Sequence, residues 1–336
     1  MHSERQEGSP MRIAIDAMGG DHAPQAIVDG VLRAAAERAD VEFVLVGDEA
    51  IVRALRATWP RNVRIRHAPE AIGPDEEPVR AIRQKKRSSL VMTVQMVNDG
   101  EADACISAGN TGAYMAAALL YVGRMPGIER PALAPVFPTT GSWGALVLDV
   151  GANVDARPQH LLQYAVMGSV YVASVEGVKN PRVGLLNIGT EATKGNELMK
   201  AAYALLEQAN LNFIGNVEAR DVLAGVADVI VCDGFTGNVL LKAAEGTAEA
   251  IFRVLREELT GRWTHKLAAA LLRPAFRRLK ARMDYKEHGG APLLGINGPC
   301  IKAHGSSDAR AIHNAVRQAI AFVERDVLGA ISRQFG

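Results

Sequence analysis

Short, nearly continuous apolar runs alternate with longer segments of helical periodicity along most of this chain. Parallel strands that are buried on both faces need such apolar runs, and the helices between them cover the sheet. The pattern therefore predicts an α/β fold with a mostly parallel sheet flanked by helices. The expected strands are 12–16, 41–46, 63–67, 104–107, 145–150, 182–187, 212–214 and 228–232. The expected helices are 23–39, 48–57, 78–99, 111–120, 158–175, 196–208 and 236–259.

The length of 336 residues allows a large core, and 48% hydrophobic with 22% charged residues is typical of a globular protein. Residues 1–10 are polar and lack the apolar stretch of a secretory signal, so we expect a disordered extension there. Residues 11–336 are predicted to form a single α/β domain. The sequence contains no apolar run as long as a membrane span.

Charge and cysteine content argue against two classes of ligand. The net charge of +1 gives the whole molecule no electrostatic preference for nucleic acid. Cys105, Cys232 and Cys300 are far apart, and no Cys or His cluster has metal-ligand spacing. We therefore expect no metal site, no disulfide and a cytoplasmic location.

Small and polar residues follow nearly every predicted strand. In a doubly wound sheet, ligands bind beyond the carboxyl ends of the strands, and glycines let backbone N–H groups approach an anion closely. The sequence therefore predicts a phosphate site, with Lys194 and Lys302 as sources of positive charge. The GxxxxGK[ST] and GxGxxG patterns are both absent, and so is a GxSxG nucleophile elbow. These absences favour direct transfer between two bound substrates, in which positioning and charge stabilisation do most of the work.

A basic segment interrupts the alternation of strands and helices. Residues 262–282 contain seven Lys or Arg and no Asp or Glu, interleaved with Trp263, Phe276 and several leucines. Pro274 is expected to break or kink any helix there. The pattern predicts a protruding basic, amphipathic helical hairpin inserted at about residues 260–285.

Taken together, the strand-end loops closely resemble those of the bacterial phosphate acyltransferases, also called acyl-carrier-protein:phosphate transacylases. The resemblance runs in one order from Met11 to about Val323, whereas the basic segment is similar only in character. The matching segments are DAMGGDHAP from Asp16, SAGNTGA from Ser107, LDVGAN from Leu148, LNIGTEATKGN from Leu186, FIGNVE from Phe213, CDGFTGNVLLK from Cys232 and GGAPLLGINGPCIKAHGSS from Gly289.

This resemblance implies that fatty acyl-[acyl carrier protein] and inorganic phosphate are converted to acyl phosphate and free carrier protein, for phospholipid synthesis. It also implies a fold similar to the isocitrate and isopropylmalate dehydrogenases, no cofactor, a homodimer, and a bacterial cytoplasmic enzyme peripherally attached to the membrane. A downstream glycerol-3-phosphate acyltransferase is an implied partner. The basic hairpin is expected to contact anionic lipid, with docking of the acidic carrier protein or a solvated dimer element as the alternatives.

The candidate site residues follow from the loops and the resemblance together. The catalytic candidates are Lys194, His304 and Asn238. Lys194 would supply charge to phosphate, His304 would orient phosphate or protonate the departing thiolate, and Asn238 would donate to phosphate or to the oxyanion. His22 is a second candidate for the proton transfer. The substrate-binding candidates are Asp16, Gly19, Gly20, His22, Asn110, Thr111, Gly112, Asn153, Thr190, Asp233, Gly237 and Lys302.

Three other functions remain open at this point. A phosphate acyltransferase that uses short acyl-CoA substrates would need similar loops but no protein partner. A non-catalytic membrane scaffold for lipid-synthesis enzymes would bind vesicles without turnover. A decarboxylating dehydrogenase would need nicotinamide and a divalent metal, and the sequence has no carboxylate cluster to support it.

Overall fold

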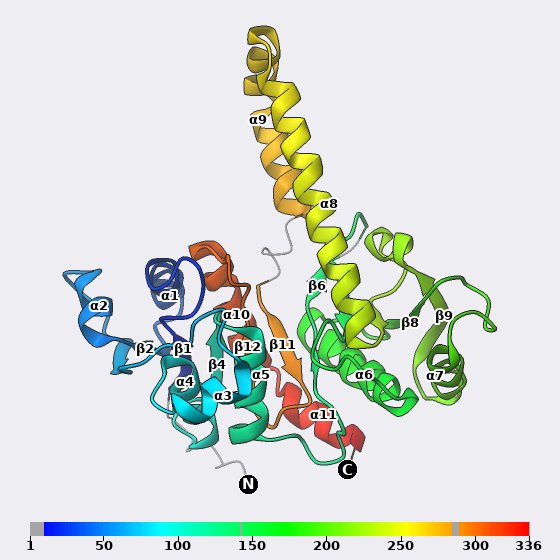
Figure 1. The fold of residues 1–336 in the computed structure, drawn as a ribbon, viewed down its shortest axis with the longest axis horizontal. Coiled ribbons are helices and arrows are strands. Elements are labelled where there is room, and N and C mark those ends of the chain that lie inside the picture. Colours follow the sequence, from blue (N-terminus) through cyan, green and yellow to red (C-terminus); the bar gives the residue numbers. More distant parts are fainter. Residues whose placement is uncertain (1–9, 142, 284–288, 336) are drawn as a thin grey trace.

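The computed structural model describes residues 10–141, 143–283 and 289–335, and residues 1–9 of the expected extension lie outside them. Within this described part, the strands form two sheets in the body of the molecule (Figure 1). The larger sheet has seven strands in the order β3-β2-β1-β4-β12-β11-β5. These are β1 (Met11–Asp16), β2 (Val41–Gly47), β3 (Val63–His67), β4 (Ala104–Ser107), β5 (Ala132–Leu133), β11 (Ala291–Leu294) and β12 (Cys300–Lys302).

The smaller sheet has five described strands in the order β6-β7-β10-β8-β9. These are β6 (Val136–Phe137), β7 (Ala145–Leu148), β8 (Arg182–Asn187), β9 (Asn212–Glu218) and β10 (Val229–Val231). Most neighbouring strands run parallel, as β1 does with β2 and β4, and β10 with β7 and β8. Antiparallel pairs join β11 to β12 and β5, and β6 to β7. The predicted α/β class with mostly parallel strands is confirmed.

Helices connect the strands, and one hydrophobic core cluster includes side chains from both sheets, such as Ile13 and Val229. The helices are α1 (Gln25–Glu37), α2 (Glu49–Ala54), α3 (Pro78–Gln84), α4 (Ser89–Asn98), α5 (Thr111–Ala117), α6 (Pro158–Tyr171), α7 (Glu197–Gln208), α8 (Gly234–Thr260), α9 (Trp263–Met283), α10 (Ala309–Glu324) and α11 (Val327–Phe335). Two π-helical turns, η1 (Ala118–Val122) and η2 (Val172–Glu176), extend α5 and α6, and η3 (Ala219–Ala224) is a 3₁₀ helix.

One expectation about helices is wrong. The single helix expected over 78–99 is divided into α3 and α4, because Lys85 turns out of the helix and its ammonium binds the Ala71 carbonyl and Glu76. Of the break or kink expected at Pro274, the break is absent, since α9 continues through this residue. A proline removes one backbone hydrogen bond, and packing against a neighbouring helix offsets the loss. The protruding hairpin is therefore formed by α8 and α9, which extend together away from the body (Figure 1).

The second turn of α8 lies directly against the end of β7. Asp233 caps α8, accepting hydrogen bonds from both the backbone N–H and the hydroxyl of Thr236. A Cβ atom on Gly237 would lie 1.9 Å from the Asp149 carbonyl oxygen, so only glycine fits there. This close approach fixes the position of the whole hairpin relative to the smaller sheet.

We expect Gly237→Ala to lower the free energy of unfolding by about 1–3 kcal/mol or more, because the added methyl group overlaps backbone that must move. Gly246→Ala on the same helix is the matched control, since a Cβ atom there meets nothing within 4 Å. That control should stabilise the protein slightly, as alanine is the better helix former by about 1 kcal/mol. Denaturant unfolding of both variants measures the difference, and equal stabilities would contradict the packing described here.

Candidate active site

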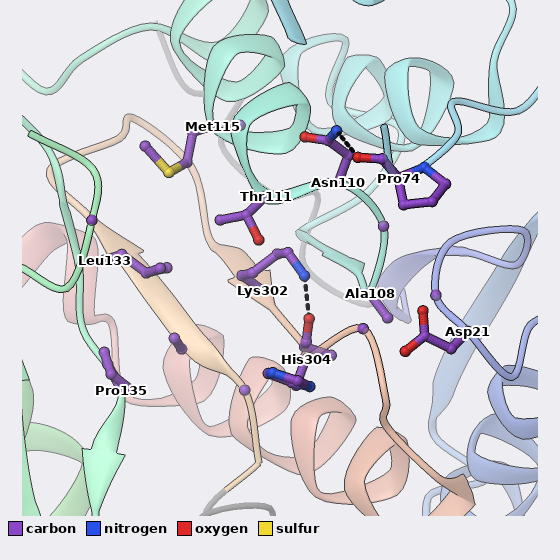
Figure 2. A pocket seen from close by; sticks show the side chains of 18 of the residues that line it. Asp21, Pro74, Ala108, Asn110, Thr111, Met115, Leu133, Pro135, Lys302 and His304 are labelled. Atoms are coloured by element: carbon purple, nitrogen blue, oxygen red, sulfur yellow. Dashed lines mark hydrogen bonds between the residues drawn. The ribbon is translucent and has the colours of Figure 1, made fainter. Parts of the chain in front are cut away.

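A cavity of about 1090 Å³ opens where the carboxyl ends of β1, β4 and β12 face the β5–β6 segment, the end of β7 and the first turns of α8. Figure 2 shows its interior, with Lys302 between a polar side that contains Asp21 and His304 and an apolar side that contains Met115 and Leu133. The cavity brings together seven of the residues predicted from sequence. These are Gly20, Asn110, Thr111, Gly112, Asn238, Lys302 and His304.

Lys302 is the buried cation of this cavity. It ends β12, pairs in register with Ser107 of β4, and is only 6% exposed. Its ammonium donates a hydrogen bond to the Ala303 carbonyl oxygen. Burial lowers the pKa of Lys302 to about 8, although the charges of Asp16 and Asp21 act in the opposite direction. A partly desolvated ammonium of this kind gains strongly from a bound anion.

Asp16 supports the cavity from behind and does not line it. Its carboxylate is 1% exposed and accepts hydrogen bonds from the Ser107 hydroxyl at 2.7 Å and the Met18 N–H at 3.2 Å. Burial raises its pKa, and these hydrogen bonds oppose the rise. A Cβ atom on Gly19 would lie 2.5 Å from an Asp16 oxygen and 2.6 Å from the Gly109 nitrogen. Gly19 therefore acts by letting two cavity loops approach each other.

The His304 side chain has a defined tautomer. Its Nδ1 atom accepts a hydrogen bond from the Ser306 backbone N–H at 3.1 Å, so in the neutral ring the proton is on Nε2. Nε2 lies 4.0 Å from the Glu245 carboxylate, and Glu245 also accepts a hydrogen bond from the Lys242 ammonium at 2.7 Å. Glu245 and Lys242 line the cavity as well. His304 is therefore a hydrogen-bond donor at Nε2, between α8 and the Gly-rich loop after β12.

The N-terminus of α5 forms another wall. The Asn110 side chain caps this helix by accepting from the Ala113 N–H, and its amide donates to the carbonyl oxygens of Pro74 and Glu76. Asn110 thus orders the wall through contacts within the protein. Thr111 is exposed to the cavity in the first turn, where helix N–H groups and the helix dipole favour anions.

Asn153 and Asp233 are absent from the lining and hold the smaller sheet in place. The Asn153 amide lies within hydrogen-bond distance of the Pro131 carbonyl, the Asp149 carboxylate and the Tyr164 hydroxyl. Asp233 caps α8, as described above. Asn238 lies one turn after that cap, exposed and beside Gly151. Of the three predicted asparagines, Asn238 is the one that lines the cavity without a side-chain hydrogen bond to the described residues.

Lys194, Thr190 and His22 are exposed and are not part of the cavity lining. Lys194 and Thr190 lie between β8 and α7, and β10 separates β8 from the cavity-side strand β7. The catalytic role predicted for Lys194 therefore gains no support from the geometry. His22 lies next to Asp21, which does line the cavity.

Sequence reasoning missed several lining residues, namely Asp21, Glu76, Met115, Lys242 and Glu245. Helical spacing could have identified two of them. Lys242 and Glu245 lie four and seven positions after Asn238, so all three share one face of α8. In the described residues, no group of three or more His, Cys, Asp or Glu is placed to hold a metal ion.

Comparison with known proteins shows the family. Residues 11–329 match the family model described as "Fatty acid synthesis protein". The phosphate acyltransferase of Geobacillus thermodenitrificans is 60% identical over 324 residues, covering 96% of this chain and 98% of that protein. A phosphate acyltransferase of Bacillus cereus is 58% identical over 322 residues, covering 96% of this chain and 97% of its own.

Solved structures show the same fold at low identity. A phosphotransacetylase from Streptococcus pyogenes superimposes with a TM-score of 0.62 at 20% identity, covering 94% of this chain and 95% of that one. A branched-chain phosphotransacylase from Enterococcus faecalis gives 0.55 at 14% identity, covering 93% and 99%. With relatives this similar along nearly the whole length, the chain belongs to the phosphate acyltransferase family and is a transferase of fatty acid and phospholipid synthesis.

Proposed function

We propose that this phosphate acyltransferase transfers a fatty acyl group from the thioester of an acyl carrier protein to inorganic phosphate, at the cavity around Lys302. The observation that carries the proposal is a buried ammonium between the polar and apolar sides of a cavity too large for phosphate alone. Family membership supplies the reaction class, and the two chemically different sides of the cavity suit its two substrates. The acyl phosphate product would be consumed by a glycerol-3-phosphate acyltransferase.

Phosphate binding would use Lys302, the first turn of α5 at Thr111 and the Gly-rich loops at Gly20 and Gly109. A phosphate oxygen then attacks the thioester carbonyl, and negative charge develops on the carbonyl oxygen. Asn238 and the Nε2–H group of His304 are donors available to that charge. Hydrogen phosphate brings one proton and the departing thiolate takes one, so the transfer needs no net acid or base from solvent.

Docking of an acyl carrier protein is supported by charge near the cavity. The loop that contains Gly73 and Glu76 lines the cavity and leads into α3. An acidic carrier protein would meet positive charge on α3 and the turn after it, which favours rapid encounter. The exposed cations on α3 and the turn after it are Arg80, Arg83, Lys86 and Arg87.

The same proposal includes contact of the hairpin with anionic lipid and assembly as a homodimer. Trp263 and Leu271 of α9 are 74% and 84% exposed, and the same helix carries exposed Arg273 and Arg278. In the described residues, no helix is long and apolar enough to cross a membrane. For the homodimer, support comes from exposed apolar side chains at three strand ends of the smaller sheet, Val154, Ile188 and Phe235.

The direct test is release of free thiol from palmitoyl-[acyl carrier protein], with and without inorganic phosphate, beside palmitoyl-CoA. We expect release that depends on phosphate and is faster with the carrier substrate. Faster release from palmitoyl-CoA would favour a coenzyme A-dependent enzyme. Vesicle binding without release of thiol from either thioester would contradict catalysis and favour the non-catalytic membrane scaffold.

Lys302 predicts a pH dependence. Since burial lowers its pKa to about 8, the ammonium loses its charge as the pH rises through this value. The ratio of kcat/KM for phosphate in wild type to that in Lys302→Met should be about 10²–10³ at pH 7 and should fall steadily above pH ~8. A ratio that stays constant between pH 7 and 9.5 would mean that the Lys302 charge does not act on phosphate.

The hairpin predicts a salt-sensitive membrane contact. Changing Arg273 and Arg278 to Gln should weaken binding to phosphatidylglycerol vesicles by about 1 kcal/mol per charge, because anionic lipid attracts each nearby cation. Arg64→Gln with Arg220→Gln is the matched control, since these arginines are 72% and 78% exposed on the body and not on the hairpin. Vesicle sedimentation compares the two double variants, and equal binding would contradict the hairpin as the lipid contact.

A further inference from the structure

The cavity is chemically divided. On one side of Lys302 are Asp21, His304 and the Gly-rich loops, and on the other side the labelled side chains are Met115, Leu133 and Pro135 (Figure 2). Phosphate is small and needs donors, so the polar side accounts for it. The apolar side is continuous with this phosphate site. The side chains of Met115, Leu133 and Pro135 carry no N–H or O–H donor.

The apolar side is a built surface with contributions from both sheets. Met115 belongs to α5, Leu133 to β5, Val136 to β6, and Val150 follows β7. The backbone of this wall is fixed, because the Leu133 N–H donates to the buried Asp149 carboxylate at 3.0 Å and the Leu133 carbonyl accepts from the Val150 N–H at 3.2 Å. Asp149 also accepts from the Ala152 and Asn153 N–H groups, so it is held firmly itself.

We propose that this apolar wall binds the acyl chain of the thioester, and that Met115 limits the chain length that the enzyme accepts. The inference rests on the proposed function, because it needs phosphate on the polar side and the reacting carbonyl near Lys302. Apolar chains gain affinity with each methylene removed from water, so an apolar wall of limited extent distinguishes chains by length.

Met115 is suited to that role by its position and its chemistry. It lies four residues after Thr111, so both side chains are on the same face of α5, one turn apart. Thr111, Lys302 and Met115 all line the cavity, and Figure 2 shows Met115 on the apolar side, farther from His304 than Thr111 is in this view. The flexible, unbranched Met side chain adapts to an inserted chain, whereas a bulky ring would shorten the available space.

The test is a chain-length series from octanoyl to palmitoyl carrier protein at saturating phosphate. In Met115→Trp, kcat/KM for the palmitoyl substrate should fall at least tenfold more than kcat/KM for the octanoyl substrate. KM for phosphate should change less than about threefold, because the polar side is untouched. Met115→Ala should shift the preference toward longer chains.

Met92→Trp is the matched control. Met92 and Met115 are both partly buried and pack against the same core cluster, but Met92 does not line the cavity. The Met92→Trp substitution should lower the Tm about as much as Met115→Trp does. It should leave the ratio of octanoyl to palmitoyl activity unchanged. A uniform loss over all chain lengths in Met115→Trp would overturn the inference and assign the wall to the carrier's pantetheine arm. If the wild-type enzyme turned over none of the acyl carrier protein substrates, from octanoyl to palmitoyl, that result would instead contradict the proposed function.

Discussion

The site depends on the ammonium of Lys302 being held where water is largely excluded. Removing a charge from water is costly, and an isolated ammonium in such a place would lose its proton. Here the Ala303 carbonyl accepts its hydrogen bond, and the carboxylates of Asp16 and Asp21 raise its pKa against the effect of burial. Asp16 is in turn kept in place by Ser107, the residue paired with Lys302 across β4 and β12. The charge, its counter-charges and the three central strands therefore depend on one another.

The same arrangement would let the cavity serve the two unlike substrates of the proposed reaction. Glycines such as Gly19 let the loops after β1 and β4 approach closely, which concentrates backbone and charge on one side. On the other side, the Asp149 carboxylate accepts hydrogen bonds from backbone N–H groups of the protein itself and is not part of the cavity lining. The β5 and β7 segments that it holds present apolar side chains to the cavity. The two carboxylates at strand ends thus order loops, and neither is needed as a catalytic base.

Local patterns predicted much of the fold. The strands β4 and β8 begin and end where the apolar runs predicted, because nearly complete burial requires such runs. The edge strand β3 also has the predicted bounds, although only Val63 in it is buried. The strands β5, β6, β11 and β12 were missed, since they are two to four residues long and their pairing comes from distant segments. The division into two sheets is also a long-range property. For the site, the loops containing Gly20, Asn110 and His304 were found, because glycines and polar residues after strands are a local signal. Lys194 carried the same signal but lies in the loop after β8, with β10 between β8 and the cavity-side strand β7, so its catalytic role stays a prediction.

The central claim is that phosphate binds at the Lys302 ammonium. The most direct measurement is the NMR titration of the Lys302 side-chain nitrogen in the wild-type protein, without phosphate and with saturating phosphate. The account predicts a pKa of about 8 in the free protein and a clear rise on binding, because an adjacent dianion stabilises the charged form. A pKa that does not change with phosphate would contradict it.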